Sequence, residues 1–124
     1  MATSIRIIHA RDFIKATPDG LLDLEKSKIL LAEIASASAP LGDYEIILDT
    51  RKAQIDMSVT DLWYLAAELS NLRKAFQRKT AVLCPSERFD QAAFFALCAQ
   101  NRGFQVGAFV TLDEAIEWLT TGTT

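Results

Sequence analysis

Two ionisable side chains stand directly behind a short apolar run of the sequence. Asp49 follows the run Tyr44–Leu48, and Arg51 lies two residues further on. A carboxylate at the end of a buried strand has the chemistry to bind a metal ion or to accept a phosphoryl group. The simpler interpretation, which we favour, is that Asp49 caps nearby backbone amides or pairs with Arg51.

A phosphoryl-accepting receiver domain needs further residues that this chain lacks. Such a domain has an acidic pair behind its first strand and a lysine behind its last strand. Here the expected first strand, Ile5–His9, is followed by Ala10–Asp12, and the expected last strand, Gln105–Val110, is followed by Thr111. The sequence therefore argues against this class of signalling domain.

A hydroxyl group that could carry a regulatory phosphate precedes an expected helix. Ser58 begins the sequence Ser-Val-Thr-Asp, which is typical of a helix N-terminus, where a serine N-cap contributes roughly 1 kcal/mol. Because helix N-termini attract anions, a phosphate on this serine would be favoured, and it would add nearly two negative charges. Ser58 is thus the first candidate phosphosite and Thr60 the second.

Histidine and cysteine are too sparse to form a recognisable catalytic or metal site. The single histidine, His9, has no serine, cysteine or second histidine at a suitable spacing. Cys84 and Cys98 form no Cys-x-x-Cys motif and are expected to be buried, reduced thiols. The five glycines are scattered, so no phosphate-binding glycine loop is present. We therefore expect no catalytic residues, no metal and no cofactor.

Length, charge and hydropathy narrow the possible classes of protein further. The 124 residues suffice for one domain covering 1–124, in which residues 120–124 are expected to form a frayed tail. A net charge of −3 argues against binding to nucleic acid. The longest apolar stretch, Ala92–Ala99, is far shorter than the roughly 20 residues of a membrane span, and the N-terminal sequence shows no signal-peptide pattern. These features predict a cytoplasmic protein.

Hydrophobic patterning predicts strands that alternate with helices. The expected strands are Ile5–His9, Phe13–Ala16, Tyr44–Asp49, Thr80–Cys84 and Gln105–Val110. The expected helices are Leu22–Ala37, a second from Ser58 or Thr60 to about Phe76, a third capped by Ser86 and running to about Asn101, and Leu112–Leu119 with a capping box of Thr111 and Glu114. Thr17–Gly20 is expected to be a turn and Thr50–Met57 a loop.

The resulting element order is β-β-α-β-α-β-α-β-α, which predicts a single α/β domain with a mixed, mostly parallel sheet covered by helices. In open sheets of this kind, ligands bind beyond the carboxyl ends of the strands. The polar residues expected near that edge, and therefore the candidate ligand-binding residues, are Asp49, Arg51, Ser58 and Ser86.

One expected helix is apolar on every side. Its segment Ala92–Ala99 contains Phe94, Phe95 and Leu97, although a helix on a sheet should be polar on its outer face. The extra apolar side chains could meet another part of the same chain, a second subunit, or an apolar ligand. Trp63 lies off the inner stripe of its own helix, beside Tyr64, and such aromatic residues are favoured anchors at interfaces. A homodimer is expected. The candidate interface residues are Trp63, Tyr64, Phe94, Phe95 and Leu97.

Four segments give the chain a resemblance to a known family. They are Tyr44–Arg51 (Tyr-Glu-Ile-Ile-Leu-Asp-Thr-Arg), Lys79–Cys84, Gly103–Phe109 and Asp113–Leu119 (Asp-Glu-Ala-Ile-Glu-Trp-Leu). Together with the element order, they resemble the SpoIIAA-like branch of the STAS domains, the sulfate-transporter and anti-sigma-factor-antagonist group. The resemblance covers nearly the whole chain and rests mostly on core and cap positions.

The resemblance implies a bacterial, non-enzymatic regulatory or protein-interaction module with a regulatory protein partner. In anti-sigma-factor antagonists a serine at the start of the helix after the third strand is phosphorylated, and Ser58 is the nearest match here. Those proteins carry Asp-Ser-x-Gly close behind the strand, whereas eight residues separate Asp49 from Ser58 in this chain. The same branch also resembles the lipid-binding CRAL-TRIO domains, so the alternative function is a carrier of a small molecule or lipid.

Overall fold

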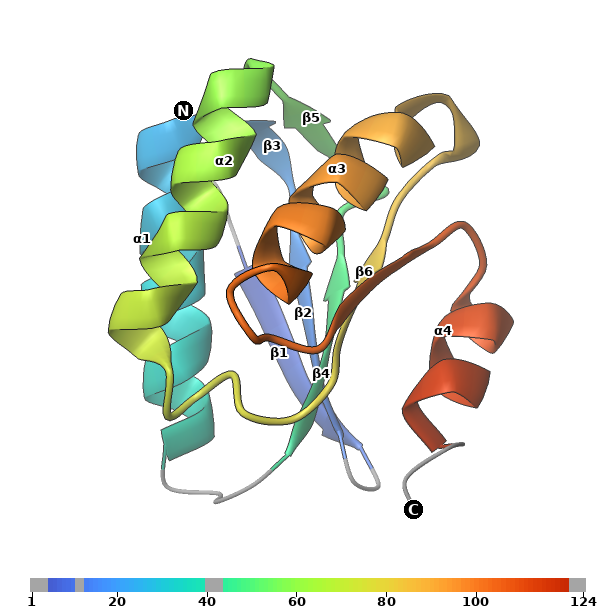
Figure 1. Cartoon of the computed structure of the whole chain (residues 1–124). Helices are drawn as coiled ribbons and strands as arrows, with labels where there is room; N and C mark the ends of the chain where they lie inside the picture. The colour runs from blue at the N-terminus through green and yellow to red at the C-terminus, as the bar shows by residue number, and fades with distance from the viewer. Residues whose placement is uncertain (1–4, 11–12, 40–43, 121–124) are drawn as a thin grey trace.

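The computed structural model describes residues 5–10, 13–39 and 44–120, and for residues 5–10 it describes the backbone alone (Figure 1). The strands are β1 Ile5–Ala10, β2 Phe13–Pro18, β3 Gly20–Leu22, β4 Glu45–Asp49, β5 Ala53–Ile55, β6 Thr80–Leu83 and β7 Val106–Phe109. The helices are α1 Leu24–Ser38, α2 Val59–Glu68, α3 Phe89–Gln100 and α4 Leu112–Thr120, with short 3-10 helices η2 Leu69–Leu72 and η3 Ser86–Arg88.

The larger sheet has the mixed, mostly parallel topology expected from the element order. Its strands lie in the order β1-β2-β4-β6-β7. β1 is antiparallel to β2, and the pairs β2–β4, β4–β6 and β6–β7 are parallel. The carboxyl ends of β4 and β6 therefore lie at the same edge of the sheet, as the predicted ligand position requires.

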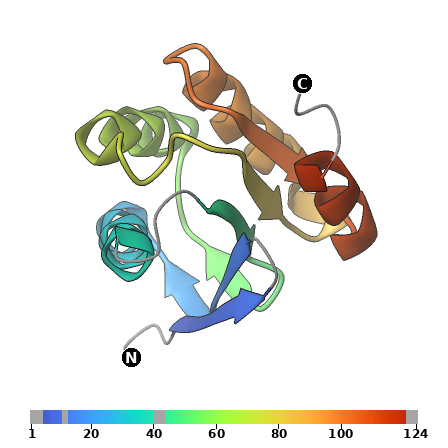
Figure 2. The same ribbon diagram turned by 90° about the horizontal axis from the view of Figure 1, so that it is seen from below.

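The helices cover the two faces of this sheet unequally. Seen from below, α1, α2 and α3 lie along one face, whereas α4 lies alone against the other (Figure 2). β4 is buried along its whole length, and its side chains alternate between the two faces. Leu48 joins the large core beneath α1, α2 and α3, and Ile47 joins a small cluster with Ala81, Ala115 and Leu119 beneath α4.

The prediction of a turn at Thr17–Gly20 is wrong. β2 continues to Pro18, and after Asp19 the chain enters β3, which pairs in parallel with β5. Gly20 does adopt a positive φ of 81°, the conformation that glycine tolerates best, but it does so at the start of a strand. The expected loop Thr50–Met57 likewise contains β5. Three-residue strands are too short to show a periodic pattern, so neither was predicted.

Three of the expected helices have clearly different boundaries in the structure. α1 begins at Leu24 and not at Leu22, because Leu22 ends β3 and Asp23 caps the helix. α2 ends at Glu68 and passes into η2, although the predicted stripe still reaches the core through Leu69 and Phe76. Ser86 does not cap α3 but begins η3, and α3 starts at Phe89 without a side-chain cap. Of the expected tail 120–124, Thr120 is the last residue of α4 and the others lie outside the described residues.

Candidate functional site

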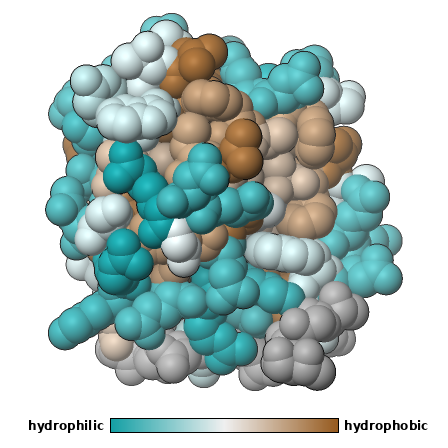
Figure 3. Space-filling model, in the orientation of Figure 1, coloured by the Kyte–Doolittle hydropathy of each residue, from teal (hydrophilic) through white to brown (hydrophobic). Residues whose placement is uncertain are grey.

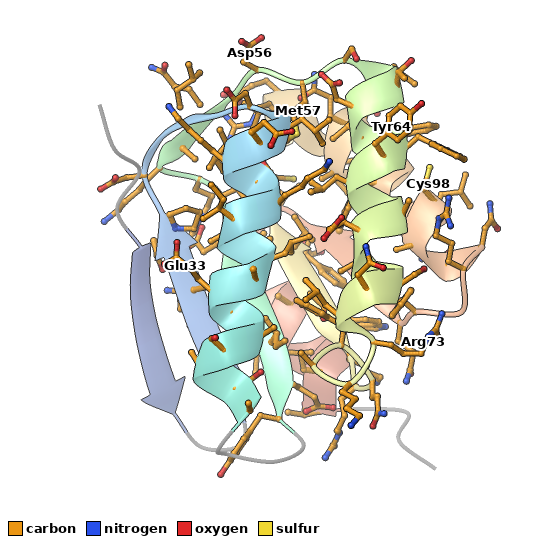
Figure 4. All side chains as sticks on the ribbon, turned by 90° about the vertical axis from the view of Figure 1, so that its left-hand side faces the viewer. Glu33, Asp56, Met57, Tyr64, Arg73 and Cys98 are labelled. Atoms are coloured by element: carbon orange, nitrogen blue, oxygen red, sulfur yellow. The ribbon has the colours of Figure 1, made fainter. Side chains whose placement is uncertain are left out.

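An apolar cavity lies where α1, α2 and α3 meet the carboxyl ends of β4 and β6. Its volume is about 70 Å³, and every one of these elements contributes to its wall. Met57, half-buried, lies near the upper ends of α1 and α2 in Figure 4 and forms part of the rim. The apolar wall is made chiefly by Leu22, Leu30, Leu31, Leu62, Leu65 and Phe95.

Polar groups interrupt this apolar wall on the strand side and on α1. Thr50 follows β4 and donates its hydroxyl to the carbonyl oxygen of Leu83 at 2.9 Å. The carbonyl oxygen of Thr50 in turn accepts a hydrogen bond of 2.6 Å from Nη2 of Arg88, in η3. Among the described residues, no carboxylate forms a salt bridge with Arg88. The guanidinium group is therefore held against the cavity by a neutral backbone oxygen.

Two buried polar atoms of the cavity wall have no hydrogen-bond partner. They are Oγ of Ser27 and Nε of Arg88, and the residue Ser27 is only 3% exposed. Both residues line the cavity, one from α1 and the other from the segment before α3. A buried donor without an acceptor costs about 1–3 kcal/mol, so these atoms mark a place where a bound acceptor would be favoured.

Cys84 also lines the cavity, directly behind β6. Its Sγ lies 3.6 Å from the carbonyl oxygen of Phe109, and the residue is a free, buried cysteine, as is Cys98. Burial raises the pKa of the Cys84 thiol, although the positive charge of Arg88 opposes the shift. A raised pKa keeps the thiol protonated at neutral pH, which does not favour a nucleophilic role.

Asp49 lies on the opposite face of the sheet from the cavity. It has the same strand parity as Ile47, which packs beneath α4, whereas Leu48 and Thr50 line the cavity. The carboxylate of Asp49 is bound side-on by Arg51 and lies 3.6 Å from Nζ of Lys15 on the neighbouring strand. The sheet therefore separates this ion-paired group from the apolar cavity.

The electrostatics of Asp49 are those of a satisfied ion pair. Burial by itself would raise the pKa of this carboxyl group. Hydrogen bonds from the side chain and backbone of Arg51, together with the charges of Arg51 and Lys15, outweigh burial and leave the pKa below its ordinary value. The pairing with Arg51 that the sequence favours is thus present in the structure.

Ser58 forms the helix cap that the sequence predicts. Its Oγ accepts a hydrogen bond from the backbone N–H of Asp61, and the Asp61 carboxylate accepts one from the backbone N–H of Ser58. Ser58 and Thr60 are both exposed at the start of α2. Oγ1 of Thr111 accepts from the backbone N–H of Glu114 in the same way, and the Thr111 hydroxyl donates to the Glu114 carboxylate at 3.2 Å.

Exposed apolar side chains gather on α2 and α3. We define the α2–α3 outer face as Val59, Trp63, Tyr64, Leu97 and Arg102. Trp63 packs edge-on against Tyr64 with ring centroids 5.2 Å apart, and Arg102 lies 5.0 Å from the centre of the Trp63 ring. Leu97 on α3 is 53% exposed. Figure 3 shows brown and tan side chains gathered over α3, and in Figure 4 Tyr64 and Cys98 lie on the same side of the molecule.

The apolar side chains of α3 are divided between the core and the surface. Phe95 is 7% exposed and belongs to the large core, so of the alternatives left open by the sequence it meets its own chain, and it is not available as an interface residue. Phe94 is half-buried and packs against the same core. Leu97 is exposed, because it lies two residues further along the helix than Phe95 and therefore points to a different side.

The structure does not gather the four candidate ligand-binding residues into one site. The hydrogen bonds and ion pairs of the described residues join Asp49 to Arg51 and Lys15, and Ser58 to Asp61. Ser86 is exposed in η3. Sequence reasoning missed Arg88 and gave Ser27 no functional role, although Ser27 lies on the apolar stripe of its helix. A serine in that stripe is a local signal that a polar group faces the core, but it does not identify the residues that the serine meets there.

The described ranges contain neither a metal-binding cluster nor a helix that could span a membrane. Residues 13–39 and 44–120, whose side chains are described, contain no cluster of three or more His, Cys, Asp or Glu placed to hold a metal ion. His9 lies in β1, where only the backbone is described. In the same part of the chain, no helix has the length and apolar character needed to cross a membrane.

Neither a protein-family model nor a curated protein matches this sequence. Solved structures do resemble it. An uncharacterized DUF3478 protein with a SpoIIAA-like fold from Shewanella loihica is 18% identical, with a TM-score of 0.61, and the match covers 94% of this chain and 93% of that one.

Two further neighbours are described as anti-sigma factor antagonists. One, from Mycobacterium paratuberculosis, is 14% identical with a TM-score of 0.62 and coverage of 95% and 94%. The other is SpoIIAA in its unphosphorylated form, 17% identical with a TM-score of 0.55 and coverage of 98% and 100%. These likenesses extend over nearly the whole of each chain, and this protein therefore has the SpoIIAA-like fold that its sequence resembles.

Proposed function

We propose that this protein is a non-enzymatic, cytoplasmic regulatory module of the STAS type, which acts by binding another protein through its α2–α3 outer face. The observation that carries the proposal is the exposed group of Trp63, Tyr64 and Leu97, which are 47%, 51% and 53% exposed. The SpoIIAA-like fold supports a regulatory role, because two of its structural neighbours are described as anti-sigma factor antagonists.

The composition of this face is that of a binding surface. Tryptophan, tyrosine and arginine are the residue types that contribute most to binding energy at protein interfaces. Here Arg102 lies over the Trp63 ring, and that ring packs against Tyr64, so the aromatic side chains are partly ordered before any partner arrives. Pre-ordered side chains lose less conformational entropy on binding, which favours affinity.

Two occupants are compatible with this face. A second copy of the chain would give the homodimer expected from the sequence, whereas a regulatory protein would give a heterologous complex. Mass in solution distinguishes them, because self-association doubles the mass of the purified protein without any other component.

A variant pair tests the face directly. Leu97→Glu places a charge within it, and Ile29→Glu places the same charge on α1, where Ile29 is 57% exposed. We expect light scattering of the purified protein, and affinity capture from its host, to show an association that Leu97→Glu abolishes and Ile29→Glu preserves. If both variants associate as the unmodified protein does, the α2–α3 outer face is not the interface.

The same proposal includes a switch at Ser58, with Thr60 as the second candidate. Ser58 precedes Val59, so a phosphate there would lie at one end of the α2–α3 outer face. It would also lie beside the Asp61 carboxylate, which now accepts a hydrogen bond from the Ser58 backbone. Repulsion between the two negative groups would break this reciprocal cap and change the local surface.

The switch is tested with Ser58→Asp, using Ser58→Ala and Thr60→Asp for comparison. We expect Ser58→Asp to weaken capture of the partner, while Ser58→Ala retains it. Mass spectrometry of the protein purified from its host would show whether Ser58 or Thr60 carries a phosphate. Equal capture by Ser58→Asp and by the unmodified protein would end the switch proposal without affecting the proposed interface.

A further inference from the structure

We propose that the cavity beneath α1, α2 and α3 binds a small monocarboxylic acid, with its apolar tail among the leucines and its carboxylate at Arg88 and Ser27. This site is separate from the α2–α3 outer face. It also differs from the residues singled out by the sequence, since Asp49 lies on the other face of the sheet.

The apolar part of the ligand follows from the cavity wall. Leucine side chains from α1 and α2 and the ring of Phe95 from α3 surround the space, and the wall contains few polar atoms. An apolar tail would replace empty space with van der Waals contacts. Because an apolar cavity of about 150 Å³ can hold benzene, with its six carbon atoms, a cavity of about 70 Å³ accepts a tail of roughly three carbon atoms.

The anionic part of the ligand follows from Arg88. Its guanidinium group is anchored at Nη2 by the Thr50 carbonyl oxygen, while its Nε is buried without an acceptor. A carboxylate oxygen at Nε would satisfy this donor and supply the counter-charge that the described residues do not provide. An alcohol would satisfy the donor without the charge, and an ammonium group would repel the guanidinium.

Ser27 supplies the second and independent observation. Its hydroxyl group is buried at 3% residue exposure, has no hydrogen-bond partner, and belongs to a residue that lines the same cavity from α1. Ser27 and Arg88 therefore line one cavity from two different elements, and each has a buried donor without an acceptor. A carboxylate has two oxygens and can accept from both.

The acid proposal is tested by ligand-observed NMR titration of the full chain at pH 7 and constant ionic strength. The probes are sodium butyrate, isobutyrate and valerate, each compared with the alcohol and the alkylammonium salt of the same tail. We expect the acids to bind at least tenfold more tightly than the alcohols, and the ammonium salts not to bind. No binding by the acids, or equal binding by acids and alcohols, would overturn the proposal.

Variants locate the binding within the cavity. Arg88→Met retains an unbranched side chain but removes the charge, and Arg102→Met is the matched control on the α2–α3 outer face. We expect Arg88→Met to weaken butyrate binding at least tenfold and Arg102→Met to leave it unchanged. Unchanged binding to Arg88→Met would overturn the proposal.

A second variant keeps the test decisive if Arg88→Met fails to fold. Ala92→Leu reduces the cavity from the α3 side without removing a hydrogen bond, and we expect it to abolish butyrate binding. Cys84 offers a further readout, because a bound acid would slow its alkylation by iodoacetamide, whereas Cys98, which does not line the cavity, would react at an unchanged rate. Full binding to Ala92→Leu, or equal alkylation of Cys84 with and without butyrate, would contradict the site.

Discussion

Arg51 binds the buried carboxylate of Asp49 side-on, with Nε 3.0 Å from Oδ1 and Nη2 2.9 Å from Oδ2. The backbone N–H of Arg51 adds a third hydrogen bond to Oδ1 at 3.1 Å. This pairing fixes the chain where β4 ends and the segment leading to β5 begins. It is therefore a structural clamp at the edge of the sheet, and it makes stability depend on pH.

The clamp should be lost in acid. Because the pKa of Asp49 is lower in the folded state than the unfolded value of about 3.9, its contribution is fully present above pH 5 and disappears as the pH falls through the folded pKa. We expect Asp49→Asn to lower the free energy of unfolding by about 1–3 kcal/mol at pH 7, and by less at pH 3. Urea denaturation measures both values.

The exposed residue Asp56 provides the control for this experiment. Asp56→Asn should change the free energy of unfolding by no more than about 0.5 kcal/mol at either pH. A loss for Asp49→Asn that is the same at pH 3 and pH 7 would show that the charge of Asp49 does not cause the effect.

The capping box at the start of α2 should contribute measurably to stability. Ser58→Ala removes the acceptor for the Asp61 N–H, and we expect a loss of about 1 kcal/mol in urea denaturation. Ser58→Asp should lose less, because aspartate also caps helices, although it lies beside Asp61. Thr60→Ala is the matched control, with an expected change near zero; equal losses at both positions would contradict the role of the cap.

Two positions on α3 should respond very differently to truncation. Phe95→Ala removes a ring that is 7% exposed, and we expect it to lower the free energy of unfolding by about 3–5 kcal/mol. Leu97→Ala, two residues along and 53% exposed, should change it by less than about 0.5 kcal/mol. Similar losses at both positions would mean that Leu97 is covered in solution, as it would be in a stable dimer.

Removing one buried hydroxyl should stabilise the protein. The Ser27 hydroxyl is buried without a partner, and alanine is also the better helix former, so we expect Ser27→Ala to raise the free energy of unfolding by about 0.5–1 kcal/mol. Ser38, equally buried on α1, donates to the Ala35 carbonyl oxygen at 3.1 Å, and Ser38→Ala should gain less. Calorimetry without added acid measures the difference.

A stabilising Ser27→Ala substitution should also weaken butyrate binding, because it removes one of the two proposed donors. This opposite change in stability and affinity is typical of residues kept for binding. Loss of stability in Ser27→Ala would indicate that the hydroxyl is already satisfied in the free protein.

The central strands β4, β6 and β7 could be predicted because each one contains a short apolar run. β4 shows this best: the expected Tyr44–Asp49 differs from the observed Glu45–Asp49 by one residue. The cap at Ser58 was also predictable, because its signal is confined to four neighbouring residues. Local patterns therefore located the framework correctly.

The cavity could not be predicted, because its wall combines residues that are distant in the sequence. Ser27 and Arg88 belong to different elements, and no spacing rule links them. The burial of Phe95 could not be predicted for a related reason. An all-apolar helix shows no preferred face, so its orientation is set by packing against α2 and the sheet. The prediction that Ser86 caps α3 was wrong because the 3-10 turn η3 lies between Ser86 and the start of the helix.

The antiparallel pairing of β1 with β2 has a consequence for the order in which this chain folds. Within the described five-stranded sheet, it is the pairing between strands that adjoin in sequence, whereas each parallel pair is separated by a helix. A hairpin forms in about 1–10 μs, but each crossover must first close a long loop. We therefore expect the β1–β2 pair to form early, and the joining of β4, β6 and β7 to set the rate of refolding.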